Sequence, residues 1–312
     1  MNIFPPSTRP VLVQWQVDTR SLWPEATQTR QLSTVAARAL AALLTDEERT
    51  GVLKYFHVRD AKMALVSQLL KHLVVARCGV SWRDTAITRD SHGKPIFKGG
   101  DGKTVVFNVS HQAGLVVLVA VYGGNASLFD VGIDVVSPSE RRTRDRQMIE
   151  EEDNKVGGRG WPHYVDMHAD VLSPREVHYL KAGLSLRDEK DRDDKDNRLR
   201  YFYALWCLRE AYVKMTGEAL LAEWLGELEF RNFVPPQEGD GQKAVSHDIR
   251  FKGKQVDDAN VCLQSVGADY MVCTAVRSCP DKSLGLALPT TDAFDVLQMD
   301  DILDFVDTSS AV

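Results

Sequence analysis

The spacing of apolar residues predicts a long helix and several strands in the first part of the chain. Residues 58–78 carry an apolar residue at every third or fourth position and precede Gly79, which predicts a helix ending there. Residues 11–17 alternate between apolar and polar, the pattern of a strand. Residues 105–109 and 115–122 are almost wholly apolar, which predicts two buried strands.

The second part of the chain follows a similar plan. Residues 128–136 predict a strand, and helical spacing indicates a helix over residues 199–217. Three candidate strands follow, at residues 227–233, 261–266 and 270–276. Although no residue-level repeat links the two parts, this order is consistent with an α+β protein built from two similar units packed together.

Local capping signals place further helices. Residues 32–44, rich in alanine and leucine, predict a helix. Thr45 and Glu48 have the spacing of a capping box and predict the start of another. Ser173 followed by Pro174 predicts a third start, because proline favours the first helical position.

Shifts in composition set the expected boundaries. We expect residues 1–127 to form an N-terminal α+β half and residues 128–312 a C-terminal α+β half. Within the second half, charged stretches near residues 140–165 and 187–198 indicate insertions. We expect the first to begin as a charged helix at residues 140–153 and to continue as a glycine-rich loop, and the second to be disordered or solvated. The chain past residue 278 is a polar tail that we expect to be an appendage.

Composition narrows the class of protein. Of 312 residues, 44% are hydrophobic and 26% charged, as in a soluble globular protein. The net charge of −6 argues against a nucleic-acid partner, which usually requires a basic protein. The sequence shows no membrane-length apolar run and no signal peptide at its start. Its five cysteines lack CxxC spacing and are typical of reduced thiols, so we expect a cytoplasmic location.

The predicted helix at residues 199–217 carries the first candidate chemistry. Glu210 and Lys214 are four residues apart and project from one face. A surface ion pair worth about 0.2–0.5 kcal/mol is the simple interpretation. The aromatic residues around the pair instead predict a covered helix, in which both charges need partners such as a metal ion and a phosphate. These residues are Tyr201, Phe202, Tyr203, Trp206 and Tyr212.

A second candidate is Asp134, which stands between apolar residues of a predicted strand. A carboxylate there is unfavourable unless it is hydrogen-bonded, paired or bound to a cation, and a structural aspartate satisfies this equally well. Together, Asp134 and Glu210 would form an incomplete oxygen cage of the kind magnesium favours, completed by water and a substrate phosphate.

Polar residues upstream extend this hypothesis to a polyphosphate site. Ser110 and His111 close a predicted strand, where side chains can face a cleft, although such a pair more often marks a turn. Four basic residues precede them, each of which alone would be an ordinary solvated charge. With the two acids, they favour a site in which basic groups bind phosphates and acids bind the metal. The basic residues are Arg59, Lys62, Arg89 and Lys94.

Five motifs in order resemble those of the 4′-phosphopantetheinyl transferases of the Sfp type. The first two also resemble the eukaryotic branch, and the charged insertions resemble its fungal members. Each motif alone is weak, but five in this order are specific. The motifs are Arg-Asp-Ala-Lys at 59–62, Gly-Lys-Pro at 93–95, Phe-Asn-Val-Ser-His at 107–111, Gly-Ile-Asp at 132–134 and Trp-Cys-Leu-Arg-Glu-Ala-Tyr-Val-Lys at 206–214.

This resemblance implies a fold, a reaction and partners. The family is a pseudo-dimer of two α+β halves with coenzyme A in the cleft between them. Its members use Mg²⁺ and move 4′-phosphopantetheine from coenzyme A to a serine of apo acyl or peptidyl carrier proteins, releasing 3′,5′-ADP. Carriers of fatty-acid, polyketide and nonribosomal-peptide synthases and of aminoadipate reductase are all served by relatives. A monomer would suffice, because one chain holds both halves.

The resemblance also implies roles for individual residues. Asp134 and Glu210 would hold magnesium on the pyrophosphate of coenzyme A, and Glu210 would be the base for the incoming serine. Lys214 would stabilise or protonate the leaving phosphate. Ser110 and His111 would contact phosphates. The residues expected at the nucleotide end of coenzyme A are Arg59, Arg89 and Lys94.

Two positions depart from the family pattern. Bacterial members carry a third acid where this chain has Val136, so another group must complete the metal site, and Gln112 is a candidate. Arg209 replaces the usual lysine before Glu210, which keeps the charge but changes the geometry. An alternative is a non-catalytic module that binds coenzyme A or a carrier protein, but the presence of both acids and Lys214 favours an enzyme. A magnesium-dependent phosphatase or nucleotidyl enzyme has no motif of its own here.

Overall fold

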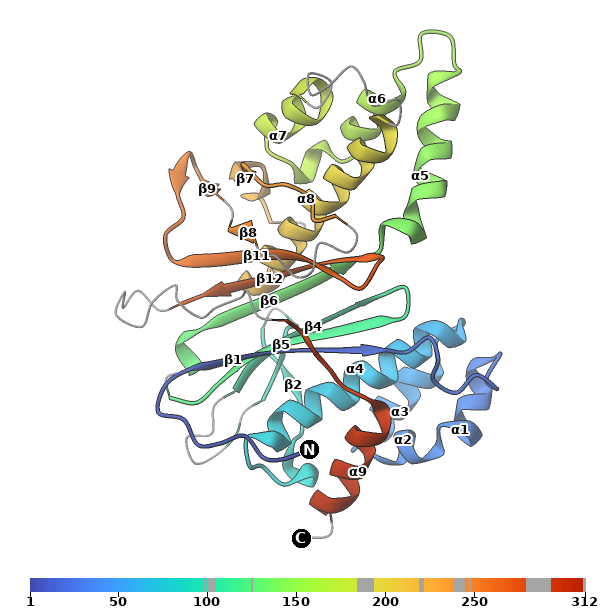
Figure 1. Cartoon of the computed structure of the whole chain (residues 1–312), viewed down its shortest axis with the longest axis vertical. Coiled ribbons are helices and arrows are strands. Elements are labelled where there is room, and N and C mark those ends of the chain that lie inside the picture. Colours follow the sequence, from blue (N-terminus) through green and yellow to red (C-terminus); the bar gives the residue numbers. More distant parts are fainter. Residues whose placement is uncertain are drawn as a thin grey trace.

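Two sheets lie face to face at the centre of the molecule, with helices on both outer sides (Figure 1). The computed structural model describes the whole chain except residues 92, 98, 100–104, 125, 184–193, 219–221, 238–244, 247, 279–292 and 311–312. The first sheet has the strand order β13-β1-β5-β4 and the second has the order β6-β12-β11-β8. The α+β fold class is confirmed, and the two layers of helix and sheet are consistent with a pseudo-dimer.

The first sheet is antiparallel through its three long strands, and α4 covers its outer face. Helix α4 forms where the apolar spacing predicted it, and the Thr45 capping box opens α3 as expected. The strands are β1 (Val11–Asp18), β4 (Val105–Gln112) and β5 (Leu115–Tyr122), with a hairpin of β2 (Thr88–Arg89) and β3 (Pro95–Ile96) nearby. The helices are α1 (Leu32–Val35), α2 (Ala37–Ala41), α3 (Asp46–Leu53) and α4 (Val58–Arg77).

In the second sheet, α8 covers the outer face. Tyr201, Phe202, Tyr203 and Tyr212 of α8 are buried, which confirms the expected covered helix. The strands are β6 (Asp130–Val136), β8 (Val245–Ser246), β11 (Ala259–Val266) and β12 (Tyr270–Arg277), and a small separate sheet holds β7 (Leu228–Arg231), β9 (Asp248–Phe251) and β10 (Lys254–Gln255). The helices are α5 (Pro138–Asp153), α6 (Gly160–Asp166), α7 (Pro174–His178) and α8 (Asp194–Thr216).

The inner faces of the two sheets form a core of their own. Val117 and Val119 of β5 pack with Val131, Ile133 and Val135 of β6 in this layer. Because side chains alternate along a strand, the next residues of β5 face α4 instead, and β5 is buried along its whole length. This two-sided burial explains the continuous apolar run in the sequence.

Helix α8 packs closely against β6 at Gly132. A Cβ atom at this position would lie 2.1 Å from the carbonyl oxygen of Ala211 and 2.4 Å from the backbone nitrogen of Met215. Both are main-chain atoms of α8, so no side chain can move aside to make room. Gly132 therefore sets the distance between the helix and the strand that carry Glu210, Lys214 and Asp134.

The end of the chain differs from the expectation. We expected the tail past residue 278 to be an appendage of the second half, but β13 (Asp295–Val296) pairs in parallel with β1. Helix α9 (Met299–Ser310) then packs into the core beneath the first sheet, through Ile302 and Phe305 among others. Both termini consequently lie on the same side of the molecule (Figure 1).

Three local expectations also need correction. The predicted helix at residues 32–44 is broken at Ala36, whose backbone is not helical. Strand β4 continues to Gln112, beyond the predicted end at residue 109, so Ser110 and His111 lie within it, and the turn falls at Ala113 and Gly114, both with positive φ. In the stretch 140–165 the expected helix forms as α5, and Asp145 of α5 accepts hydrogen bonds from Tyr164 and Tyr203. Of the other charged stretch, residues 187–193 lie outside the described part, and residues 194–198 form the beginning of α8 rather than a disordered or solvated insertion.

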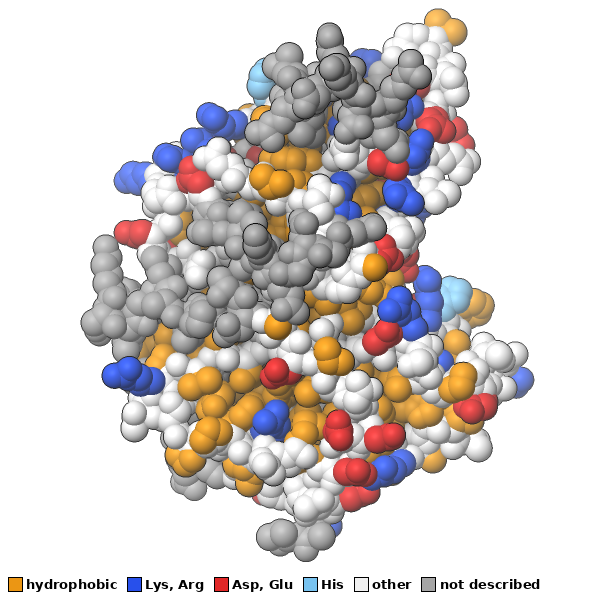
Figure 2. All heavy atoms as spheres, viewed as in Figure 1, with side chains coloured by type: hydrophobic (Ala, Val, Ile, Leu, Met, Phe, Trp, Pro, Cys, Tyr) orange, Lys and Arg blue, Asp and Glu red, His pale blue; other side chains and the backbone are white. Residues whose placement is uncertain are grey.

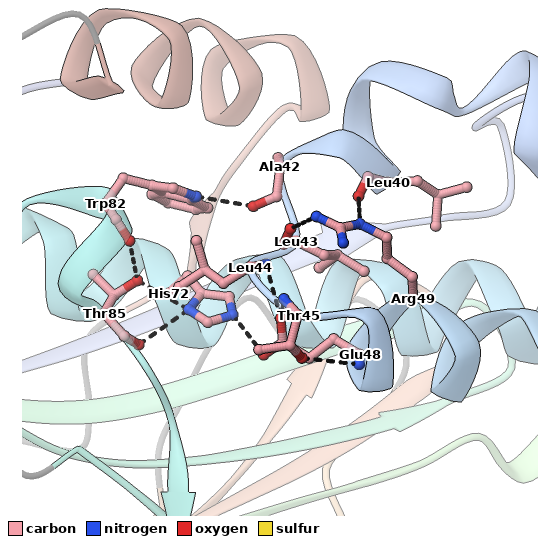
Figure 3. A network of polar contacts seen from close by, with 10 residues as sticks. All are labelled: Leu40, Ala42, Leu43, Leu44, Thr45, Glu48, Arg49, His72, Trp82 and Thr85. Atoms are coloured by element: carbon pink, nitrogen blue, oxygen red, sulfur yellow. Dashed lines mark hydrogen bonds and ion pairs between the residues drawn. The ribbon is translucent and has the colours of Figure 1, made fainter.

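A buried polar network holds the helices of the first half around α4 (Figure 3). His72 of α4 is fully buried; its Nε2 lies 2.9 Å from Glu48 and its Nδ1 lies 3.0 Å from the hydroxyl of Thr85. The indole of Trp82 donates to the carbonyl of Ala42. Buried polar groups that are paired in this way fix one arrangement of their helices.

We predict that Gly132→Ala destabilises the protein by about 1–3 kcal/mol, because the added methyl group overpacks the contact between α8 and β6. The free energy of unfolding from denaturant titration measures this. Gly226→Ala is the matched control, since the nearest atom to its Cβ outside its own turn would be the carbonyl oxygen of Leu172, 4.0 Å away. A stability of Gly132→Ala equal to that of Gly226→Ala would contradict the close approach.

Candidate active site

Three of the candidate residues form a hydrogen-bonded triangle between the two sheets and α8. The ammonium of Lys214 lies 2.6 Å from Oδ1 of Asp134 and 2.9 Å from the hydroxyl of Ser110. Ser110 in turn donates to Asp134 over 3.0 Å. Asp134 and Ser110 are each only 7% exposed, so the charge of Lys214 compensates a carboxylate that would otherwise be costly to bury.

Glu210 lies one helical turn before Lys214 on α8. Burial raises the pKa of Glu210, and the negative charge of Asp134 raises it further. Burial opposes the charge of Lys214, but Asp134 outweighs it and raises the pKa of Lys214 above its usual value. Because the negative charges of Asp134 and Glu210 repel each other and only one lysine is paired with them, a further positive charge nearby would be favourable.

The position of Gln112 follows from the way β4 runs beside β6. The side-chain oxygen of Asn108 accepts from the backbone N–H of Ile133, and Ser110 reaches Asp134. Two residues beyond Ser110, Gln112 closes β4, and its amide nitrogen donates a hydrogen bond of 2.9 Å to Glu140 of α5, the helix that follows β6. The structure thus holds the side chain of Gln112 at the first turn of α5, shortly after the strand that carries Asp134 and Val136.

This site fits a magnesium ion. Carboxylate and amide oxygens are hard ligands that suit Mg²⁺, which keeps water and takes oxygen atoms from substrate phosphates. Within the described residues there is no group of three or more His, Cys, Asp or Glu side chains placed to hold a metal by themselves. Asp134 and Glu210 carry two carboxylates of this kind, and Gln112 carries an amide oxygen.

The basic residues expected at the nucleotide end have different environments in the structure. Arg59, at the start of α4, is exposed and lies 3.3 Å from Glu140. Arg89 donates to the carbonyl of Gly93 in its own hairpin. The ammonium of Lys94 donates to the carbonyls of Val131 and Met215. Since Met215 lies in the last turn of α8, the positive charge of Lys94 also stabilises the C-terminal end of this helix.

His111 lies on the opposite side of β4 from Ser110. Since neighbouring residues of a strand point to opposite faces, Ser110 faces β6 while His111 faces the side of α4. Partial burial lowers the pKa of His111, as do the charges of Lys214 and Lys71. Ser110 and His111 therefore project from opposite faces of β4.

Two residues of this region were missed in the sequence. Lys71, on α4, is only 8% exposed, and burial followed by the charge of Arg89 lowers its pKa to about 8. A charged residue at a core-facing position of an apolar helix was the available signal. Glu140 was hidden in a charged stretch, although it lies in the first turn of α5, shortly after the strand that carries Asp134.

Arg209 has a structural role that its place beside Glu210 concealed. It is 1% exposed, lies 2.7 Å from Glu176 of α7 and donates to the carbonyls of Leu225 and Leu228. Neighbouring residues on a helix point in different directions, so Arg209 faces away from the site. Its pairing with Glu176 anchors the outer side of α8.

The surface view shows an indentation at the right edge of the molecule, between the lobe that carries α5 and the part that carries α4 (Figure 2). Side chains of both charges and histidine gather at its lower rim. No described helix has both the length and the apolar character needed to cross a membrane.

Comparison with known proteins agrees with this arrangement. Residues 31–123 match the family model described as "4'-phosphopantetheinyl transferase, N-terminal". Residues 130–275 match the model described as "4'-phosphopantetheinyl transferase superfamily".

Three relatives span most of the chain. 4'-phosphopantetheinyl transferase 1 of Fusarium mangiferae is 46% identical over 96% of this chain and 97% of its own length. 4'-phosphopantetheinyl transferase NpgA of Emericella nidulans is 34% identical over 87% of this chain and 83% of its own. The human L-aminoadipate-semialdehyde dehydrogenase-phosphopantetheinyl transferase is 25% identical over 82% of this chain and 76% of its own.

We predict that Arg209→Ala lowers the free energy of unfolding by about 3–5 kcal/mol, because it leaves the buried carboxylate of Glu176 without its ion-pair partner. Thermal and denaturant unfolding measure the loss. Lys155→Ala, which removes a lysine paired with Glu152 on the surface, is the control and should change stability little. Equal effects of the two substitutions would show that Arg209 does not anchor α8.

Proposed function

Since this chain belongs to the 4′-phosphopantetheinyl transferase superfamily, we propose that Asp134, Glu210 and Lys214 are the catalytic centre of its transfer reaction. The enzyme transfers 4′-phosphopantetheine from coenzyme A to a serine of carrier proteins. The observation that supports these three residues is the triangle of Lys214, Asp134 and Ser110, with Glu210 one turn away on the same helix.

Glu210 is the base in this proposal. The serine hydroxyl of the carrier attacks the phosphorus that bears the pantetheine arm, its proton passes to Glu210, and 3′,5′-ADP leaves. A carboxylate in a partly buried setting is a stronger base than one in water, which suits this role. Asp134 and Glu210 would hold Mg²⁺, which neutralises the pyrophosphate charge when it is bound.

Lys214 serves the leaving group. Its ammonium has three N–H groups. Among the described residues, two of them donate hydrogen bonds, to Asp134 and to Ser110. A third N–H is left for an oxygen of the departing phosphate. Asp134 holds the ammonium in place, so the charge is oriented before substrate arrives.

The remaining contacts with coenzyme A are assigned to residues around this centre. Ser110 lies within the triangle, and His111, Arg59 and Arg89 would reach the phosphates and the nucleotide. Lys94 would act at the nucleotide end while it holds the end of α8. The partners are apo acyl or peptidyl carrier proteins, and we propose a monomer in the cytoplasm.

A non-catalytic binding module is the weaker alternative. Such a module would need the basic residues but no base. The raised pKa of Glu210, beside Asp134 and a pre-oriented lysine, is an arrangement that binding alone does not require.

We predict that Glu210→Gln lowers the transfer rate by about 10²–10⁴-fold, because the amide cannot accept the proton of serine. The assay incubates the protein with coenzyme A, Mg²⁺ and an apo carrier protein and follows the mass of the carrier. The control is Glu151→Gln on the exposed side of α5. Near-normal turnover by Glu210→Gln would remove this residue from the mechanism, and no mass gain with the unmodified protein would refute the transferase activity.

Lys71 lies close enough to His111 and Arg89, two residues proposed to contact coenzyme A, for their charges to interact. We therefore also predict that coenzyme A binds more weakly as the pH rises through about 8, because Lys71 then loses its charge. Calorimetric Kd values at pH 7, 8 and 9 would show the effect. Lys71→Arg should remove this weakening, since arginine stays charged, and Lys71→Met should bind weakly at every pH. Tight binding by Lys71→Met at pH 7 would contradict a role for Lys71.

A further inference from the structure

Glu140 connects two residues that the proposed function assigns to different parts of coenzyme A recognition. Its Oε2 accepts a hydrogen bond of 2.9 Å from the amide nitrogen of Gln112, the candidate metal ligand. Its Oε1 lies 3.3 Å from the guanidinium of Arg59. One carboxylate thus uses both oxygens to contact a residue expected at the metal and one expected at the nucleotide.

We propose that Glu140 is a positioning residue that directs the amide oxygen of Gln112 to the metal site, in place of the third acid that Val136 lacks. This inference rests on the proposed function. It concerns a residue that lies four positions beyond Val136, in the first turn of α5.

The chemistry of the amide fixes its orientation. An ionised carboxylate only accepts hydrogen bonds, so the nitrogen of Gln112 must face Glu140. The reverse orientation would place two oxygen atoms against each other. The oxygen of Gln112 therefore points away from Glu140 and is available as a hard ligand, which is the atom that Mg²⁺ prefers.

Glu140 also acts between the two halves of the protein. It belongs to α5 in the second half, whereas Gln112 of β4 and Arg59 of α4 belong to the first. Pro138 at the start of α5 fixes where the helix begins, and β6 fixes where Pro138 lies. The backbone after Asp134 thereby places Glu140 across from Gln112.

The test measures metal binding without turnover. Mn²⁺ substitutes for Mg²⁺, and its binding in the presence of coenzyme A, without carrier, is followed by electron paramagnetic resonance. We expect Glu140→Ala to weaken Mn²⁺ binding by about 10-fold or more, as is usual when a partner of a metal ligand is removed. Glu140→Gln keeps an oxygen that can accept from Gln112 and should restore most of the affinity. Glu150→Ala, an exposed acid on the same helix, is the control.

A double variant separates positioning from a general effect on structure. If Glu140 acts through Gln112, Glu140→Ala combined with Gln112→Ala binds Mn²⁺ no more weakly than Gln112→Ala alone. Additive losses, or wild-type Mn²⁺ affinity in Glu140→Ala, would overturn the inference. If the unmodified protein transfers phosphopantetheine normally, either result refutes only the role of Glu140. An unmodified protein that neither binds Mn²⁺ with coenzyme A nor modifies a carrier would refute the proposed function itself.

Discussion

The contact between α8 and β6 at Gly132 is the constraint on which the site depends. No side chain separates the helix from the strand at this point, so the two backbones touch. The contact brings the face of α8 with Glu210 and Lys214 against Asp134, two residues from Gly132. Catalysis of phosphoryl transfer relies on the positions of charged groups, and small displacements reduce it strongly. Gly132 therefore sets the geometry of the candidate site.

The two faces of α8 carry ion pairs in different environments. On its outer side, Arg209 and Glu176 are both buried and paired with each other, with backbone carbonyls and N–H groups as additional partners. On its inner side, Lys214 and Asp134 are paired but partly open, and Glu210 has a raised pKa. A buried pair with these partners stabilises one packing arrangement, whereas the incompletely neutralised acids favour the approach of a cation. This difference supports the proposed division, with anchoring on one face of the helix and chemistry on the other.

Much of this site was visible in the sequence because it lies on elements with a clear period. The apolar spacing located α4 and α8, and charges within apolar runs pointed to Asp134, Glu210 and Lys214. The path of the tail was not predictable, because the partner of β13 lies about 280 residues earlier in the chain and a two-residue strand has no period. The break at Ala36 was hidden because alanine favours helix, and only the fold overrides it. Glu140 and Lys71 were missed because the residues around them are distant in the sequence, and the spacing of apolar residues does not reveal such neighbours.

The C-terminal elements β13 and α9 pack against the first half, and this packing also helps to fix the geometry of the candidate site. The two halves are joined directly between β5 and β6, and they are joined a second time because the segment after β12 leads back to β13 and α9. Lys94, between β2 and β3, adds a bond from the first half to Met215 at the end of α8, and Glu140 adds one at the start of α5. Each connection restricts how β4 can move relative to β6, and the triangle of Ser110, Asp134 and Lys214 spans that boundary. A site assembled from two halves thus obtains from these cross-connections the fixed geometry that pre-organised charge requires.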